Sequence, residues 1–240
     1  MWNKKKVSVV FPTYNEKNSI RKSVNDFFSS GYVDEIIVVN NNAAKGTSEE
    51  VKKTKAREVF ESRQGYGYAI RKGLKEAKGD LILVSEPDGT FDGKDVVKLL
   101  SYSDNFDAVF GSRTNKNMIW GGANMGGFLK WGNWALAKLI MALFNATLLT
   151  DVGCTMRLIS KKSISKIENN FTIGGSQFGP EMMILVLLKK INYIEIPVNY
   201  KKRIGESSVT GSKIKAFVLG LQMIYLIVSY RIKSWLGMVN

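Results

Sequence analysis

Residues 80–91 read Asp80-Leu81-Ile82-Leu83-Val84-Ser85-Glu86-Pro87-Asp88-Gly89-Thr90-Phe91. The apolar first half is typical of a buried strand, and two carboxylates follow it with one residue between them. Residues i and i+2 of an extended segment point to the same side, so Glu86 and Asp88 can face one ion. Two hard anionic oxygens at a strand end suit Mg²⁺ or Mn²⁺ that also binds a diphosphate. The alternative interpretation is a solvated acidic turn.

Strands and helices alternate on both sides of this stretch. Short apolar runs predict further strands at residues 7–11, 35–39, 58–60 and 106–111, with amphipathic helical patterns between them. The alternation predicts an α/β fold with a mostly parallel central sheet and helices on both faces. Ligands of such folds bind outside the carboxyl ends of the strands. Polar clusters at residues 14–16, 40–42, 86–88 and 112–113 follow predicted strands, so we expect the functional site there.

The composition restricts the chemistry. The 240 residues include no histidine and one cysteine, Cys154. These counts exclude imidazole acid–base chemistry, an intramolecular disulfide and a cysteine-based zinc cluster, and they fit a reducing, cytoplasmic compartment. Catalysis must therefore depend on carboxylates, Lys and Arg side chains, backbone dipoles or a hard metal ion.

The net charge of +14 favours anionic partners such as phosphorylated substrates or anionic lipid. The alternative interpretation is that the charge serves only to keep the protein soluble. Nucleic acid is not expected as a partner, because no motif that reads bases is visible. The first residues lead directly into a strand, and no signal peptide is evident.

Two apolar segments distinguish the second half of the chain. Residues 130–149 carry Trp131 and Trp134 with one internal charge, Lys138, and residues 217–228 are similarly apolar. We expect amphipathic helices that lie in a membrane interface at the cytoplasmic face, with buried core helices or packing in a homo-oligomer as alternatives. The expected organisation is a catalytic domain at 1–210 and a C-terminal apolar helical segment at 211–240.

Six motifs occur in order along the chain: Val9-Val10-Phe11-Pro12-Thr13-Tyr14-Asn15-Glu16, Gly65-Tyr66-Gly67, Glu86-Pro87-Asp88, Gly111-Ser112-Arg113, Asp151-Val152-Gly153-Cys154-Thr155-Met156-Arg157, and Ile194-Glu195-Ile196-Pro197-Val198-Asn199-Tyr200 with Arg203 and Gly205-Glu206-Ser207. Together they resemble the family-2 glycosyltransferases of the GT-A fold, especially the dolichol- and polyprenyl-phosphate mannosyl- and glucosyltransferases. The resemblance extends from Val7 to about Ser208.

Three positions depart from the family pattern. Residues 40–47 are Asn-rich where the family usually has a D-D-x-S-x-D-G-T segment, which changes the charge beside the donor. Glu86 replaces the usual first Asp of the D-x-D motif. Ser208 stands where a basic residue is usual, so contacts to the acceptor phosphate must come from elsewhere.

The resemblance implies a metal-dependent, inverting transfer of a hexose from GDP- or UDP-hexose to a polyprenyl phosphate. Glu86 and Asp88 are the implied ligands of Mg²⁺ or Mn²⁺, and Asp88 is the principal catalytic residue. The implied donor-binding residues are Pro12, Tyr14, Glu16, Asn40, Asn41, Gly65 and Asp88. The implied cations for the acceptor phosphate are Arg113, Lys130, Arg157 and Arg203.

Other functions remain open at this point. A sugar hydroxyl as acceptor requires a carboxylate base, for which Glu181 is the first candidate and Asp151 the second. A nucleotide-sugar pyrophosphorylase or a non-catalytic nucleotide-binding module is a remoter alternative. Pyrophosphorylases place a Gly-rich loop directly after the first strand, where this chain has residues 11–16.

Overall fold

The computed structural model describes residues 1–205 and 212–239. A seven-stranded sheet of these residues has the order β3-β2-β1-β4-β6-β5-β7. The strands are β1 (Val7–Thr13), β2 (Glu35–Asn40), β3 (Arg57–Phe60), β4 (Leu81–Val84), β5 (Ala108–Ser112), β6 (Arg157–Ser160) and β7 (Tyr193–Pro197). Neighbouring strands are parallel except at β6, which is antiparallel to β4 and β5. The predicted α/β fold with a mostly parallel sheet is therefore confirmed.

Two details of the sheet differ from the prediction. β1 continues through Pro12 to Thr13 rather than ending at Phe11. Beyond Val10 this strand pairs only with β2. Pro12 has no N–H to donate, and the strand tolerates it because β4 does not pair with this position. Neither β6 nor β7 was predicted as a strand: the four residues of β6 begin with arginine and carry no clear periodic signal, and residues 194–197 were recognised only as part of a sequence motif.

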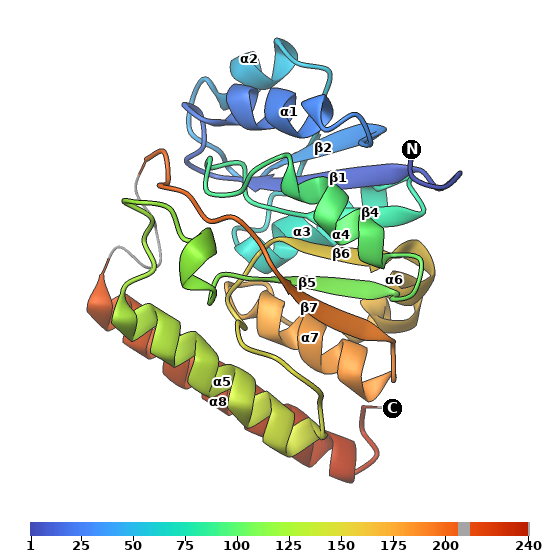
Figure 1. The fold of residues 1–240 in the computed structure, drawn as a ribbon, viewed down its shortest axis with the longest axis vertical. Coiled ribbons are helices and arrows are strands. Elements are labelled where there is room, and N and C mark those ends of the chain that lie inside the picture. The colour runs from blue at the N-terminus through green and yellow to red at the C-terminus, as the bar shows by residue number, and fades with distance from the viewer. Residues whose placement is uncertain (206–211, 240) are drawn as a thin grey trace.

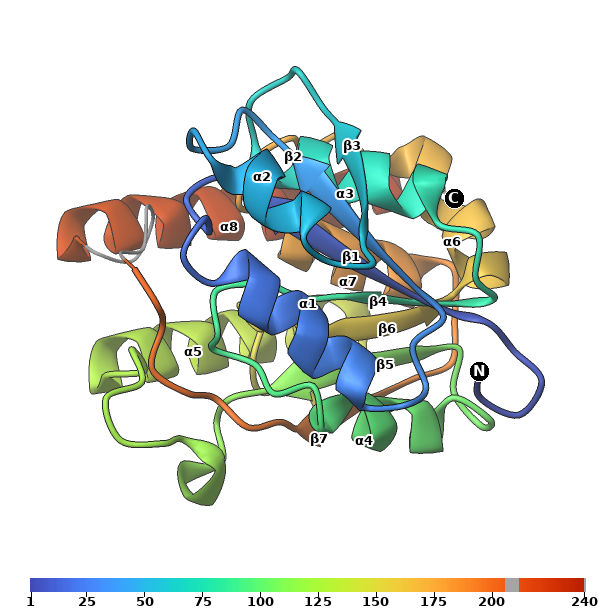
Figure 2. The same cartoon turned by 90° about the horizontal axis from the view of Figure 1, so that it is seen from above.

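Helices cover both faces of the sheet (Figure 2). One face holds α1 (Ile20–Ser29), α2 (Thr47–Lys52) and α4 (Asp95–Tyr102), and the other holds α3 (Tyr66–Glu76), α6 (Lys161–Ile167) and α7 (Phe178–Leu188). α1 places Ile20, Val24 and Phe27 on one side at helical spacing, and all three are buried. Burial of each such side chain contributes about 1.5–3 kcal/mol.

Two long helices complete the molecule. α5 (Gly127–Phe144) and α8 (Lys213–Trp235) contact each other and lie side by side along one edge (Figure 1). The inner side of α8 places Met223, Leu226, Ile227 and Tyr230 in the same buried cluster as α7. The apolar C-terminal segment therefore belongs to the main core as well as forming a surface.

The outer side of α8 remains apolar and exposed. Phe217, Leu221, Tyr225 and Trp235 are each more than half exposed. By length and composition, residues 214–235 are sufficient to cross a membrane, and 22% of the most apolar stretch is buried within the protein. Residues Glu206, Ser207 and Ser208 of the last sequence motif lie outside the described residues.

Candidate active site

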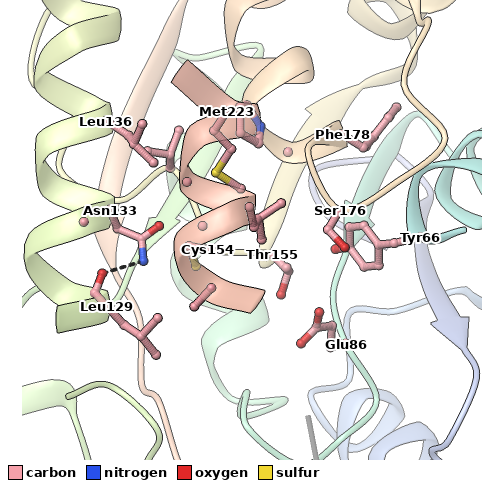
Figure 3. Close-up of a pocket in the computed structure, with 18 of the residues that line it drawn as sticks. Tyr66, Glu86, Leu129, Asn133, Leu136, Cys154, Thr155, Ser176, Phe178 and Met223 are labelled. Carbon is pink, nitrogen blue, oxygen red and sulfur yellow. Dashed lines mark hydrogen bonds between the residues drawn. The ribbon is translucent and has the colours of Figure 1, made fainter. Parts of the chain in front are cut away.

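A cavity of about 810 Å³ opens at the predicted edge of the sheet. It begins where β1 and β4 end and continues between α5, α7 and α8. Figure 3 shows Glu86 beside Thr155 in this cavity, with Tyr66 on one side of them and Leu136 on the other. The structure brings eight of the predicted site residues to its wall: Pro12, Tyr14, Glu16, Asn41, Glu86, Arg113, Arg157 and Arg203. The predicted residues outside the wall are Asn40, Gly65, Asp88, Lys130 and Glu181.

The cavity changes character along its length. Carboxylates and arginines gather at the end near the sheet, where Glu16, Glu86, Arg113 and Arg203 lie. The other end, between α5 and α8, is apolar, and its wall includes Leu136, Leu139, Leu219, Met223 and Ile224. One continuous cavity therefore joins a charged compartment to an apolar one.

Arg203 is the centre of the charged compartment. Its Nη1 lies 2.7 Å from Oδ2 of Asp88 and 3.7 Å from Oε2 of Glu86. Its Nη2 donates to Oε1 of Glu16 at 2.8 Å. The predicted phosphate-binding arginine thus pairs with both predicted metal-binding carboxylates and with a predicted donor-binding residue.

The loop after β4 fixes Asp88 more rigidly than Glu86. Oδ1 of Asp88 accepts from the backbone N–H and the hydroxyl of Thr90 at 2.9 and 2.5 Å, and the side chain is fully buried. Its Oδ2 faces Arg203 without the alignment of a hydrogen bond, and it has no other donor within residues 1–205 and 212–239. Burial, and then the adjacent Asp88 charge, raise the pKa of Glu86 to about 8, against the opposing effect of Arg203.

The carboxylate pair suits a divalent ion that also contacts a phosphate. Within residues 1–205 and 212–239 no group of three carboxylate or thiol side chains forms a complete metal cage. Mg²⁺ and Mn²⁺ do not need one, because they use one or two carboxylates and take their other ligands from water and substrate phosphates. The buried Oδ2 of Asp88, which lacks an aligned donor, is the oxygen best placed to serve as a ligand.

Arg113 is held by a buried carboxylate. Its Nε and Nη2 donate to the two oxygens of Asp151 at 2.8 and 2.9 Å, and its guanidinium lies 5.1 Å from the ring centre of Tyr200. Burial alone raises the pKa of Asp151, but the Arg113 charge and hydrogen bonds outweigh it and hold that pKa below its usual value. Asp151 is therefore an ionised partner of Arg113 and has no free oxygen facing the cavity.

Arg157 connects three segments around the cavity. Its guanidinium donates to the carbonyls of Cys154, Val152 and Gly179, with the Nε to Cys154 distance at 2.7 Å. The side chain is almost wholly buried. Three of its N–H groups thus stabilise the protein, which leaves the others for a ligand.

Glu181, predicted as the base for a sugar-hydroxyl acceptor, lies outside the cavity wall. This carboxylate is fully buried at the start of α7 and accepts from the N–H and hydroxyl of Thr172, the N–H of Ile173 and the hydroxyl of Tyr230. The predicted base is therefore a structural acceptor that attaches α8 to the loop before α7. In this arrangement the oxygens of Glu181 are engaged by these donors and do not line the cavity.

Asn40 and Asn41, which were predicted to bind the donor, form hydrogen bonds within the protein. Asn40 turns away from the cavity and donates to Ser48 and Glu58. Asn41 lines the cavity, but its amide donates to the carbonyls of Glu61 and Arg63 and its oxygen accepts from Gly65 N–H. Asn41 therefore shapes the loop beside the charged compartment, and the Asn40 side chain is engaged by Ser48 and Glu58.

Gly65 and Lys130 do not lie at the cavity either. At Gly65, φ is +151° and a Cβ atom would approach the Gly174 carbonyl to 2.3 Å. Glycine is therefore required for contact with the segment before α7 rather than for direct approach of a ligand. Lys130 lies on α5 outside the cavity wall.

Several lining residues were not predicted. Tyr66, Asn133, Cys154, Thr155 and Ser176 all contribute to the wall. Burial, and then the Glu86 charge, raise the pKa of Tyr66 well above its usual value. Its position between two motif glycines at the start of a helix was the available signal. Asn133 and Ser176 carried no such signal, because only the packing of α5 and α7 brings them to the cavity.

Comparison with solved structures shows the same fold. The glucosyl-3-phosphoglycerate synthase of Mycobacterium tuberculosis in complex with Mn²⁺, UDP and glucosyl-3-phosphoglycerate aligns with a TM-score of 0.72 over 95% of this chain and 80% of that one, at 16% identity. The complex of the same synthase with Mg²⁺ and UDP aligns with a TM-score of 0.70 over 95% and 79%, at 17% identity.

Comparison with curated proteins identifies related sequences. A dolichyl-phosphate hexose transferase of Haloferax volcanii is 28% identical over 85% of this chain and 86% of its own length. A low-salt glycan biosynthesis hexosyltransferase, Agl6, of the same organism is 26% identical over 85% of this chain and 49% of its own length. The model of the family described as "Glycosyl transferase family 2" matches residues 8–168. That match covers more than half of the chain, which therefore belongs to glycosyl transferase family 2 and is a glycosyltransferase.

Proposed function

We propose that this glycosyltransferase moves a hexose, with inversion, from UDP- or GDP-hexose to a polyprenyl phosphate at the cytoplasmic face of a membrane. The observation that carries the proposal is the cavity that joins the charged compartment of Glu16, Glu86 and Arg203 to the apolar space between α5 and α8. A sugar nucleotide suits the first compartment, and an isoprenoid chain suits the second. Membership of a glycosyltransferase family sets aside the pyrophosphorylase and the non-catalytic nucleotide-binding module.

The donor compartment offers both stacking and polar contacts. Tyr14 is 44% exposed at the end of β1, where its ring can cover a nucleotide base. Glu16 reaches the same space, with Oε2 held by the N–H groups of Tyr14 and Asn15. This anchoring orients Oε1 toward Arg203 and the donor, where it can accept from a ribose hydroxyl.

Glu86 and Asp88 are the proposed ligands of Mg²⁺ or Mn²⁺. Two similar solved structures are complexes with these ions and UDP, which supports the assignment by analogy of fold. When bound, such an ion neutralises the charge that develops on the departing nucleoside diphosphate. Thr90 fixes Asp88 for this purpose through two hydrogen bonds.

The cavity wall favours an acceptor that arrives ionised. Among the described lining residues the carboxylates are Glu16 and Glu86, and both pair with Arg203. Glu181 and Asp151 are buried in other hydrogen bonds, so neither supplies the base that a sugar hydroxyl needs. A phosphate monoester is already anionic at neutral pH and needs only cations, which Arg113 and Arg157 supply in the cavity wall.

The surface beside the apolar end suits a membrane interface. Phe128, Trp131, Phe217, Tyr225 and Trp235 are each more than half exposed on α5 and α8. Lys138 lies 5.6 Å from the ring centre of Trp134, and Arg231 lies 4.7 Å from that of Trp235. Aromatic and basic residues together are typical of helices at the headgroup level. Association of two copies through this surface stays a prediction.

A transfer assay with extraction tests the proposal. The purified protein is incubated with Mn²⁺, labelled UDP-glucose or GDP-mannose, and either a polyprenyl phosphate or a free sugar. We expect label in the organic phase only with the lipid phosphate. Label on the free sugar alone would contradict the proposed acceptor. A thermal-shift series with UDP-, GDP- and dTDP-sugars identifies the donor base, because a ligand that binds only the folded state raises the Tm.

A further inference from the structure

The guanidinium of Arg203 lies where three acidic side chains converge. Asp88, Glu86 and Glu16 come from two different loops, and all three face the same two nitrogen atoms. Arg203 is about four-fifths buried, and its Nε has no hydrogen-bond partner among the residues that the structure describes. This one side chain thus forms ion pairs with both proposed metal-binding carboxylates and a hydrogen bond with Glu16, the proposed nucleotide-binding residue.

The backbone holds Arg203 in place over the loop after β4. The N–H of Ile204 donates to the Asp88 carbonyl, and the N–H of Lys201 donates to the Thr90 carbonyl, both at 2.8 Å. The side chain of Ile204 lies against Gly89, where a Cβ atom would approach it to 3.1 Å. The segment is therefore attached by its main chain, and the long Arg203 side chain can move while the attachment persists.

A divalent ion and the Arg203 guanidinium cannot occupy this position together. Mg²⁺ bonds carboxylate oxygens at about 2.0–2.1 Å, whereas Nη1 of Arg203 already lies 2.7 Å from Oδ2 of Asp88. An ion within bonding distance of Oδ2 would also lie close to the guanidinium, and two cations repel strongly in a buried site. An ion that binds Oδ2 of Asp88 from the side that Arg203 now occupies must therefore displace the guanidinium.

We propose that Arg203 is a positioning residue that couples metal binding to nucleotide binding. The divalent ion takes over Glu86 and Asp88, and the released guanidinium turns to the diphosphate, for which arginine is a suitable partner. Its departure also frees Oε1 of Glu16 for the nucleotide, while Oε2 stays anchored. The inference rests on the proposed metal site and adds an obligatory exchange of cations to it.

The test is a titration with Mn²⁺ followed by electron paramagnetic resonance, at one fixed pH, with and without UDP. We expect Arg203→Gln to bind Mn²⁺ about fivefold more tightly than the unmodified protein without UDP, because the competing cation is gone. In the unmodified protein, UDP should increase the affinity for Mn²⁺. This increase should be smaller in Arg203→Gln, because the variant has no guanidinium to bind the diphosphate. Arg203→Lys should lie between the two.

Lys201→Gln is the matched control. It removes one positive charge from the same segment, but Lys201 pairs with Asp92, which does not line the cavity. Its Mn²⁺ affinity should stay within about twofold of the unmodified protein. An equal gain in Lys201→Gln, or no gain in Arg203→Gln, would overturn the inference. If the inference fails in this way but Asp88→Asn abolishes Mn²⁺ binding, the proposed metal site is still supported. Failure of every variant to bind Mn²⁺ would overturn both.

Discussion

Arg113 and Asp151 form a two-pronged ion pair, with Nε to Oδ2 at 2.8 Å and Nη2 to Oδ1 at 2.9 Å. The backbone N–H groups of Arg113 and Gly153 donate to the same carboxylate at 2.8 and 3.0 Å. The pair attaches the end of β5 to the segment before β6, and it presents the guanidinium edge to the cavity. Its loss should therefore affect stability as well as acceptor binding.

The first prediction concerns acid stability. The pKa of Asp151 is lower in the folded chain than its unfolded value of about 3.9. A lowered folded pKa contributes stability that is present above pH 4 and is lost as the pH falls through the folded value. Denaturant unfolding followed by circular dichroism should show this loss below about pH 4 in the unmodified protein.

The variant Asp151→Asn tests that attribution. It should be about 3–5 kcal/mol less stable at neutral pH, because Arg113 is left as a buried charge without a partner. Its stability should also fall less steeply below pH 4. A variant that keeps the same acid dependence would show that other carboxylates determine it.

The second prediction concerns Glu181. In Glu181→Gln, the amide N–H₂ would face the N–H and hydroxyl of Thr172 and the hydroxyl of Tyr230, which are themselves donors. We therefore expect a loss of about 1–3 kcal/mol in the free energy of unfolding. Transfer by the folded fraction should persist, because Glu181 does not reach the cavity. Tyr230→Phe, which removes one of the donors, should lose about 1 kcal/mol. A stable but inactive Glu181→Gln protein would restore Glu181 as a catalytic base.

The third prediction concerns Asp88. Asp88→Asn should reduce transfer by at least about a hundredfold while the fold persists, since stabilisation of the leaving diphosphate depends on this carboxylate. Asp92→Asn is the control, because Asp92 lies on the same loop and pairs with Lys201 outside the cavity wall. Rates are compared with circular dichroism spectra of each variant. Full activity of Asp88→Asn would remove the metal assignment.

The fourth prediction concerns the outer side of α8. Deletion of the chain from Lys213 onward would also remove Met223 and Tyr230 from the core, so substitutions on the surface are the sharper test. Replacing Tyr225 and Trp235, which are exposed on α8 and do not line the cavity, together by Ser should reduce co-sedimentation with anionic liposomes several-fold without changing the Tm by more than a few degrees.

Phe60→Ser is the control for membrane binding. Phe60 is 66% exposed on β3, at the opposite edge of the sheet from β7. Its replacement removes a comparable apolar side chain from a surface that we do not assign to lipid. Equal loss of liposome binding in both variants would indicate general stickiness rather than a membrane-binding side.

Local patterns of sequence determined much of the fold. The runs at β1, β2 and β4 are apolar on both faces, which is the signal of parallel strands covered by helices. The polar residues after these strands were correctly expected at one edge of the sheet, because parallel strands end on the same side. The expectation that Glu86 and Asp88 lie together came from their spacing, since two residues separated by one lie on the same side of an extended segment.

Only the tertiary structure decided what each side chain contacts. Glu181 and Asn40 have the chemistry of a base and of a nucleotide ligand, yet burial commits them to Tyr230, Thr172, Ser48 and Glu58. Arg203 is 115 positions beyond Asp88 in the chain but 2.7 Å from it in space. Sequence periodicity records which face of an element is buried, whereas hydrogen bonds and ion pairs between distant segments depend on how those elements pack. For that reason the sequence determined the sheet and its functional edge, and packing alone determined which charges meet there.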